Sequence, residues 1–286
     1  MIYILCSVGL NSLLFVILKW FNHFNINTLQ ALVVNYLTAA CIGFLFSYET
    51  FEIAELPNKT WYWGSFFMGF LFISVFYLTA LASQRNGLSA TSVASKMSVV
   101  IPITLGVIIY KESLGGYKII GIILALAAVY FTSKKEEGKI NQNKEWLLPA
   151  LVFLGAGTID ASLKIMQNHH VTIEEIAVFS SHTFFMAFVA GSCLIGYQLV
   201  KNNKAIKIRN CMAGVLLGIP NYFSLYFMIR MLNHPTWESS TIFTIHNVAI
   251  VILTTLLGII LFKEKINLRN SIGILIAIIA IVLVTF

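Results

Sequence analysis

Residues 110–128 read YKESLGGYKIIGIILALAA, and residues 262–280 read FKEKINLRNSIGILIAIIA. The two stretches align without a gap, and the alignment places the Lys-Glu dipeptide at 111–112 over the one at 263–264. The shared apolar character of two helices does not account for a repeated Lys-Glu pair at the same distance from a glycine. We therefore predict that the chain contains an internal duplication, with these stretches at equivalent positions in its two halves.

Small residues follow the Lys-Glu dipeptide in both stretches. The aligned residues are Gly121, Ala125 and Ala128 in the first stretch and Gly273, Ala277 and Ala280 in the second. Their spacing places them on one face of a helix. Small residues on one face let the backbone of a neighbouring membrane helix approach closely. We expect each of these helices to pack against a neighbour through this face.

The composition excludes an ordinary soluble protein. The 286-residue chain is 58% apolar and 11% charged, whereas soluble domains are about 45–50% apolar and about 25% charged. The net charge is +7, but the basic residues lie between apolar runs and form no continuous surface for nucleic acid. The four cysteines lack the paired spacing of a disulfide framework or a zinc site, so we expect neither a metal nor a cofactor.

Apolar runs of about 20 residues are long enough to cross a hydrocarbon layer about 30 Å thick as helices. The runs lie at residues 2–20, 28–47, 61–83, 88–110, 116–132, 146–166, 174–200, 211–232, 237–262 and 270–285. They predict an all-α integral membrane protein with ten transmembrane helices, which crosses the cell membrane several times and contacts the lipid bilayer.

The longest polar stretch follows the fifth apolar run and divides the chain in two. We predict a first five-helix repeat at 1–132, a polar linker at 133–145 and a second five-helix repeat at 146–286. Because five is an odd number, the second repeat enters the membrane from the opposite side. The predicted architecture is therefore two inverted repeats, which is typical of secondary transporters.

The segment Phe76–Phe131 resembles a known family. An aromatic-rich helix is followed by a short turn, a Ser-rich helix start, Pro102 within the helix, and then Glu112 and Gly121. This order resembles the end of an EamA-type repeat of the drug/metabolite transporter superfamily. The second half repeats the Glu and the Gly but has Thr254 where the proline would fall. The resemblance implies ten helices and alternating access. It does not identify the substrate, because members carry amino acids, nucleotide sugars, sugar phosphates or drugs.

Lys96 is the most informative polar residue inside an apolar run. It is the ninth residue of a predicted helix that starts at Leu88, and so lies about 12 Å deep at about 1.5 Å per residue. A central charge costs about 2.5–3.5 kcal/mol and therefore turns towards the bundle interior, a partner or water. Two interpretations stay open. Lys96 is a structural group paired with a carboxylate or with helix carbonyls, or it faces a solute path and attracts an anionic group or gates proton exchange.

Other polar residues near mid-depth come from several predicted helices. The candidates for substrate binding are Lys96, Asn11, Asn35, Asn221, Asn247, Tyr77 and Tyr226. The candidates for binding a coupling proton are Asp160, His182 and His246. For Asp160 the alternative is an ion pair with Lys164 one helical turn later, and for each histidine it is a hydrogen-bonded packing role. Residues 119–131 and 271–286 contain no ionisable side chain except Tyr130, so those two helices are expected at the periphery.

Together these patterns predict a secondary transporter, gradient-driven or facilitative, that moves a small polar metabolite by alternating access. No phosphate-binding loop for ATP hydrolysis occurs in the sequence, and we do not expect an enzyme. One alternative is a membrane-embedded enzyme acting on a lipid-linked substrate, which needs catalytic groups clustered near one interface. Another is a non-transporting subunit or sensor, which needs a soluble partner-binding segment.

The distribution of Lys and Arg leaves the membrane orientation open. If the loops alternate sides, most basic residues lie on the side opposite the N-terminus, and the positive-inside tendency then places both termini outside. The family resemblance implies that both termini lie in the cytoplasm. The orientation, the direction of transport, the coupling ion and the oligomeric state therefore stay unassigned.

Overall fold

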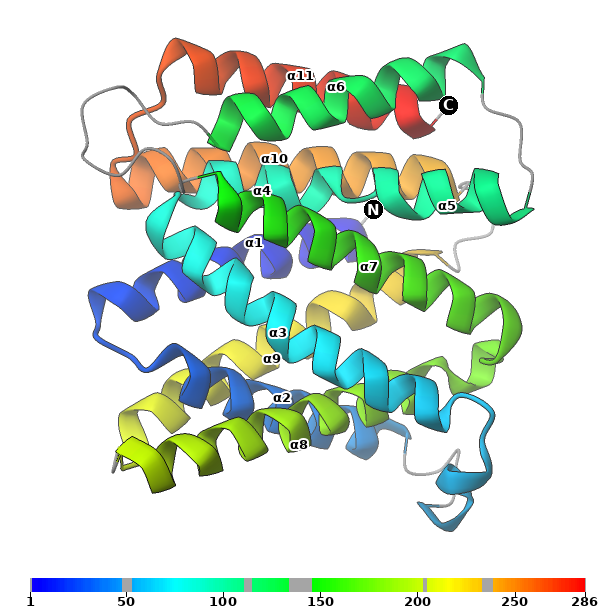
Figure 1. Cartoon of the computed structure of the whole chain (residues 1–286), viewed down its shortest axis with the longest axis vertical. Helices are drawn as coiled ribbons and strands as arrows, with labels where there is room; N and C mark the ends of the chain where they lie inside the picture. The colour runs from blue at the N-terminus through cyan, green and yellow to red at the C-terminus, as the bar shows by residue number, and fades with distance from the viewer. Residues whose placement is uncertain are drawn as a thin grey trace. The chain divides into compact units, whose positions relative to one another are not determined.

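The computed structural model describes residues 2–47, 53–110, 115–133, 146–202, 205–232 and 239–285 (Figure 1). The regular structure within these ranges is helical. The α-helices are α1 (Ile2–His23), α2 (Thr28–Ser47), α3 (Tyr62–Arg85), α4 (Leu88–Met97), α5 (Val100–Tyr110), α6 (Gly116–Ser133), α7 (Leu147–His169), α8 (Ile176–Asn202), α9 (Ile208–Leu232), α10 (Ser239–Phe262) and α11 (Leu268–Thr285). Two short 3-10 helices are η1 (Ile53–Asn58) and η3 (Ile173–Glu175).

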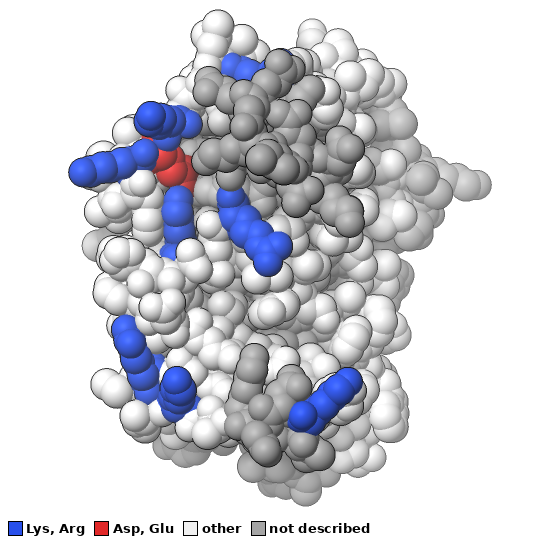
Figure 2. Space-filling model, turned by 60° about the vertical axis from the view of Figure 1, so that its left-hand side comes forward, with Lys and Arg blue, Asp and Glu red and all other residues white. Residues whose placement is uncertain are grey.

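The helices follow the predicted apolar runs closely. Within the described ranges, eight spans are long and apolar enough to cross a membrane, and α6 and α11 are shorter apolar helices. The prediction of an all-helical membrane-spanning chain is therefore confirmed. On the face drawn in Figure 2, the described charged residues are mostly Lys and Arg, and the rest of the described surface is uncharged, in agreement with the composition. The inverted arrangement of the repeats and their boundaries stay predictions.

The fourth predicted run is interrupted, which the sequence prediction did not include. Helix α4 ends at Met97, and α5 begins at Val100. Pro102 accounts for the break, because it has no N–H and its ring clashes with the carbonyl four residues earlier, which belongs to Ser98. The Ser98 carbonyl accepts instead from the Ile101 N–H at 2.9 Å, and the Ser98 hydroxyl donates to the Ser95 carbonyl at 2.6 Å. By contrast, α9 continues as a helix through Pro220.

The chain forms two compact units. Unit 1 contains Met1–Trp20, Leu78–Asp160 and Phe223–Phe286, and unit 2 contains Phe21–Tyr77 and Ala161–Tyr222. Each unit therefore combines segments from both predicted repeats.

In unit 1, α6 and α11 pack side by side along their length (Figure 1). The predicted small-residue faces meet there, since Ala125, Ala128, Ala277 and Ala280 are at most 1% exposed and belong to one hydrophobic cluster. A Cβ added to Gly273 would lie 2.8 Å from the Thr132 side chain. The prediction of close packing through these faces is confirmed, and their opposite faces carry exposed apolar residues.

Helix α4 packs against α6, α10 and α11 within the same unit. Thr254, which stands where the family proline would fall, joins α10 to α4 because its hydroxyl lies 2.8 Å from Ser92 Oγ. The same hydroxyl lies 2.6 Å from the Ile250 carbonyl in its own helix. At the position aligned with Pro102, Thr254 therefore leaves α10 unbroken and links it to α4 by a polar contact.

In unit 2, α2 packs against α8 and, through two glycines of α9, closely against α9. A Cβ added to Gly214 would lie 2.5 Å from the Ala31 carbonyl, and one added to Gly218 would lie 2.6 Å from Thr38. At the start of both helices, Asn210 Nδ2 donates to Gln30 Oε1 at 2.5 Å. Glycines at this spacing let two membrane helices approach each other closely.

Candidate functional site

Unit 1 brings three of the predicted ionisable residues together from three helices. Lys96 of α4 is near enough to Asp160 of α7 and to His246 of α10 for electrostatic interaction. In the described structure, no nitrogen–oxygen contact within 4.0 Å joins Lys96 to Asp160, so the two charges are neighbours without forming a closed ion pair. The Asp160 side chain is exposed, and its Oδ2 lies 3.4 Å from Ser98 Oγ.

The break between α4 and α5 explains how a lysine is tolerated at this depth. Lys96 is in the last turn of α4, one residue before the helix ends. The last carbonyls of a helix lack intrahelical partners and carry the negative end of the helix dipole. A cation is favoured there, so the end of α4 at Met97 offsets part of the cost of placing the charge of Lys96 at this depth.

His246 is held by hydrogen bonds that link α1, α9 and α10. The Ser7 hydroxyl donates to the Ser224 carbonyl at 2.9 Å and lies 3.0 Å from His246 Nε2. Because a hydroxyl has one proton to donate, Ser7 Oγ accepts from the histidine. This assigns the proton of the neutral imidazole to Nε2 and leaves Nδ1 as an acceptor. His246 is 5% exposed, so its ring is enclosed and the contact with Ser7 orients it.

Three other predicted residues belong to the same unit. Asn247 follows His246 in α10 and is 9% exposed, whereas Asn11 of α1 is half-buried. Tyr226 of α9 is also half-buried and packs edge-on against Phe223 and Phe227, with ring centroids 6.4 and 5.6 Å apart. Unit 1 thus contains six of the predicted site residues.

Unit 2 contains the other predicted residues, and two of them are in contact. Asn221 Nδ2 donates to Asn35 Oδ1 at 3.2 Å. Asn35 is fully buried, and its own Nδ2 finds no hydrogen-bond acceptor among the described residues. Buried donors are nearly always paired in folded proteins, so this amide group is unusual. Tyr77 of α3 is half-buried.

His182 of α8 is packed among aromatic rings in unit 2. Ser65 donates its hydroxyl proton to the Tyr62 carbonyl at 2.6 Å, and its oxygen lies 2.7 Å from His182 Nδ1. The imidazole therefore carries its proton on Nδ1. The rings of Trp61 and Tyr62 lie 5.7 and 5.0 Å from the His182 ring. This environment matches the alternative that the sequence left open for His182, a hydrogen-bonded packing role.

A charged cluster joins the segments just before α3 and α8, outside the helices that are long and apolar enough to cross a membrane. Lys59 Nζ lies 3.0 Å from Glu175 Oε1, and Trp61 Nε1 donates to Glu175 Oε2 at 3.3 Å. The hydrogen bond and charge of Glu175 raise the pKa of Lys59. For Glu175, partial burial acts to raise the pKa, but hydrogen bonds from Lys59 and from the Thr172 backbone lower it overall.

Sequence reasoning missed the hydroxyl groups that hold this site together. Ser7 lies inside α1, and Ser98 directly follows the last residue of α4. Along an apolar run, a lone serine is not distinguishable from a small packing residue. From the sequence, Lys263-Glu264 indicated only a duplication, and no structural role was predicted for Glu264. In the structure Glu264 pairs with Lys19 and accepts from the Leu88 N–H.

Comparison with known proteins agrees with the helical fold. Residues 1–134 match the EamA-like transporter family. The resemblance predicted from the sequence is therefore confirmed, and the EamA-like match together with the apolar helices identifies a multi-pass membrane protein. Members of this family are membrane transporters.

Two full-length similarities accompany the EamA-like match. An uncharacterised protein of Haemophilus influenzae is 26% identical over 287 residues, covering 97% of this chain and 94% of the relative. A solved crystal structure covers 99% of this chain and 94% of its own chain with a TM-score of 0.60 at 14% sequence identity. The latter similarity supports the fold and carries no information about the substrate.

Proposed function

We propose that the protein is a secondary transporter that moves a small polar metabolite across the membrane by alternating access. The observation that carries the proposal is the convergence of Lys96, Asp160 and His246 from three helices of unit 1. A charge at the centre of a membrane helix costs about 2.5–3.5 kcal/mol. Grouping two charges and an imidazole at such depth is costly without a function that requires them.

The pairing of helices supports the inverted repeat on which we base the proposal of alternating access. In unit 1, α6 packs against α11 and α4 against α10, and in unit 2, α2 packs against α8. Each pair consists of helices that the predicted duplication makes equivalent, namely the second, fourth and fifth of each half. Contacts between equivalent elements are expected where a two-fold axis relates two copies of one unit.

In unit 1 the proposed substrate contacts are Lys96, Asn11, Asn247 and Tyr226. Lys96 supplies a positive charge that no closed ion pair neutralises in the described structure. The amides supply donors and acceptors, and the phenol of Tyr226 adds a hydroxyl at the edge of an aromatic cluster. Such a set suits a small solute with at least one charged group and several hydrogen-bonding groups.

In unit 2 the proposed contacts are Asn35, Asn221 and Tyr77. The Nδ2 group of Asn35 is a buried donor with no partner among the described residues. Leaving such a donor unpaired costs about 1–3 kcal/mol. A solute that accepts a hydrogen bond from Asn35 would recover this energy.

For proton coupling we favour Asp160 and His246 over His182. Asp160 is exposed and adjacent to Lys96, and His246 keeps an imidazole acceptor at Nδ1. His182 is enclosed by aromatic rings and by Ser65, so in this proposal it is a packing residue. Binding a proton at either favoured position alters the charge that a solute meets beside Lys96.

Transport into proteoliposomes tests the proposal. The assay measures uptake of radiolabelled amino acids, nucleosides, organic acids and sugar phosphates by wild-type protein, Lys96→Met and Asp160→Asn. Lys207→Met is a matched control, because Lys207 is exposed and lies outside the predicted spans. We expect wild type and the control to carry at least one class, and the two site variants to be slower by about tenfold or more, as for loss of a charge-assisted contact of about 1.5–3 kcal/mol. Wild-type rates in both site variants would remove these residues from the mechanism.

A further inference from the structure

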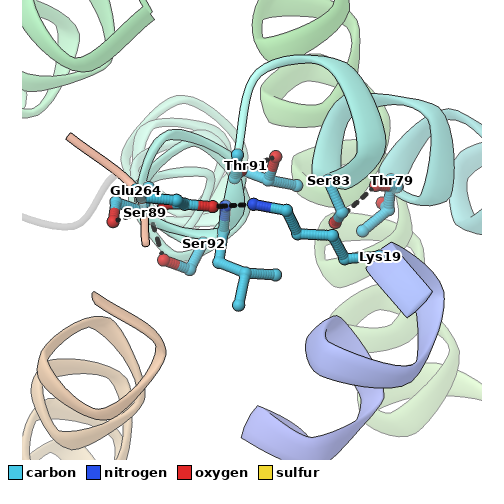
Figure 3. Close-up of polar contacts among 9 residues, drawn as sticks. Lys19, Thr79, Ser83, Ser89, Thr91, Ser92 and Glu264 are labelled. Carbon is cyan, nitrogen blue, oxygen red and sulfur yellow. Dashed lines mark hydrogen bonds and ion pairs between the residues drawn. The ribbon is translucent and has the colours of Figure 1, made fainter. Parts of the chain in front are cut away.

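Glu264 is the acidic residue of the second Lys-Glu dipeptide, and its carboxylate joins three segments of unit 1. Helix α10 ends at Phe262, Lys263 has the left-handed backbone conformation with φ 50°, and the Glu264 N–H bonds back to the Gly258 carbonyl at 3.1 Å. Figure 3 shows the Glu264 carboxylate and the Lys19 ammonium of α1 pointing towards each other beside the first turn of α4.

The same carboxylate caps α4. Its Oε1 accepts from the Leu88 N–H at 2.7 Å, and its Oε2 lies 3.4 Å from Ser89 Oγ. The residue at the N-cap of α4 is Gly87, which makes no side-chain capping hydrogen bond. The first N–H groups of a helix lack intrahelical partners. An acidic group at this end satisfies such an N–H and complements the helix dipole. In α4 this group comes from a residue 176 positions away in the chain.

Two glycines provide the space for this carboxylate. A Cβ added to Gly87 would lie 2.9 Å from Glu264 Oε1, and one added to Gly258 would lie 2.6 Å from Oε2. The Gly87 backbone also has φ 98°, a conformation that residues with a side chain rarely adopt. The side chains of Lys19 and Glu264 are only 15% and 14% exposed. The carboxylate is therefore enclosed, and little movement of it is possible without movement of α4.

Helix α4 has only ten residues, and its opposite end carries Lys96. We propose that Glu264, held by Lys19, is a positioning residue that anchors the first turn of α4 and thereby sets where Lys96 lies in the site. Leu88 and Lys96 are eight residues apart, about 12 Å along a helix. A displacement of the first turn is transmitted over this distance because a short helix moves as a rigid element. The inference rests on the proposed function for the role of Lys96 and adds Glu264 to the site.

The direct test is the chemical accessibility of position 96. The four native cysteines are replaced by Ala, Lys96→Cys is introduced, and its reaction with a water-soluble maleimide is timed in proteoliposomes. Glu264→Gln and Lys19→Met are then compared with Lys263→Met, a control that removes an exposed neighbouring charge outside the cap. We expect both test variants to change the labelling rate by about fivefold or more, because cysteine reactivity follows exposure. The control should stay within about twofold.

A further set of variants separates capping from simple charge pairing. Gly258→Ala keeps both charges but pushes the carboxylate away, so it should change the labelling in the same direction as Glu264→Gln. The charge swap of Lys19→Glu with Glu264→Lys restores an ion pair, but a lysine cannot accept from the Leu88 N–H. Labelling should therefore stay altered in the swap. Glutamine removes the charge but keeps an oxygen that can accept from the Leu88 N–H, whereas Glu264→Met removes both. Wild-type labelling in Glu264→Met, or its restoration by the swap, would overturn the proposal. If Glu264→Gln or Glu264→Met fails to fold, Gly258→Ala and Lys19→Met decide.

The labelling assay needs no solute, so its outcome is independent of the proposed function. A wild-type protein that carries none of the labelled solutes contradicts the proposed function and leaves the link between Glu264 and position 96 measurable. If the wild-type protein transports a solute but Gly258→Ala and Glu264→Gln leave the labelling rate at position 96 unchanged, only the positioning role is contradicted.

Discussion

Enlarging a small residue between α6 and α11 should destabilise the fold far more than changing the outer faces of these helices. Ala128 and Ala280 are 0% exposed and belong to the same cluster. Ala128→Leu inserts three more heavy atoms where no accessible space is left. Overpacking of this kind costs about 1–3 kcal/mol. Since the two alanines are equivalent in the predicted duplication and share one interface, Ala280→Leu should have a similar effect.

The expected effect can be expressed as a shift in unfolding temperature. About 2 kcal/mol corresponds to a fall of about 4–8 °C, at about 2–4 °C per kcal/mol for a chain of this size class. Thermal unfolding of the purified protein in detergent measures the shift. The matched controls are Ile123→Ala and Leu275→Ala on the outer faces, 61% and 59% exposed, which should stay within about 2 °C. If the two alanine variants unfold no earlier than the controls, the packing argument is wrong.

Two further predictions concern hydrogen bonds and pH. Ser7→Ala removes the acceptor of the buried His246 Nε2–H and should lower the free energy of unfolding by about 1–3 kcal/mol. Ser12→Ala should cost little, because the buried Ser12 Oγ has no partner among the described residues. Thermal unfolding of both variants measures the two losses, and equal losses would contradict the prediction. Glu175→Gln should lower the unfolding temperature at pH 7. The pKa of Glu175 in the folded protein lies below its ordinary value of 4.5, so its carboxylate is charged at pH 7 and pairs with Lys59. A carboxylate with a lowered folded pKa stabilises the fold above its unfolded pKa and loses this contribution as pH falls through the folded value. The difference from wild type should therefore shrink below about pH 4.5, and a difference independent of pH between 7 and 3 would refute the assignment.

The helices themselves could be predicted because the constraint on them is local. In lipid each span satisfies its own backbone hydrogen bonds, so a sufficiently long apolar run is recognisable without knowledge of its neighbours. The small-residue faces of α6 and α11 followed from spacing within one helix. The break after Met97 was missed because Pro102 alone does not determine whether a helix kinks or ends, as the continuous α9 around Pro220 shows.

The composition of the site was less predictable than the helices. The cost of placing a charged or polar side chain deep in a membrane helix identified Lys96, Asp160 and His246 individually. The structure places Lys96 near both of the others in unit 1. Sequence spacing suggested Lys164 as the partner of Asp160, whereas the structure adds the charge of Lys96, from a different helix. Such partners depend on which helices become neighbours, and periodicity within one helix contains no information about that.

The amino-acid sequence by itself determined that this chain lies in a membrane as apolar helices and that a few polar groups are placed within them at a cost. It also predicts that the two halves are related. These properties depend on hydropathy, length and spacing along one segment. Only the tertiary structure decided that Ser7 orients His246, that Glu264 caps α4, and that the Nδ2 donor of Asn35 has no acceptor within the part of the chain that the structure describes. The physical reason is that a hydrogen bond or ion pair between distant segments exists only after packing has brought its two partners within about 3 Å of each other.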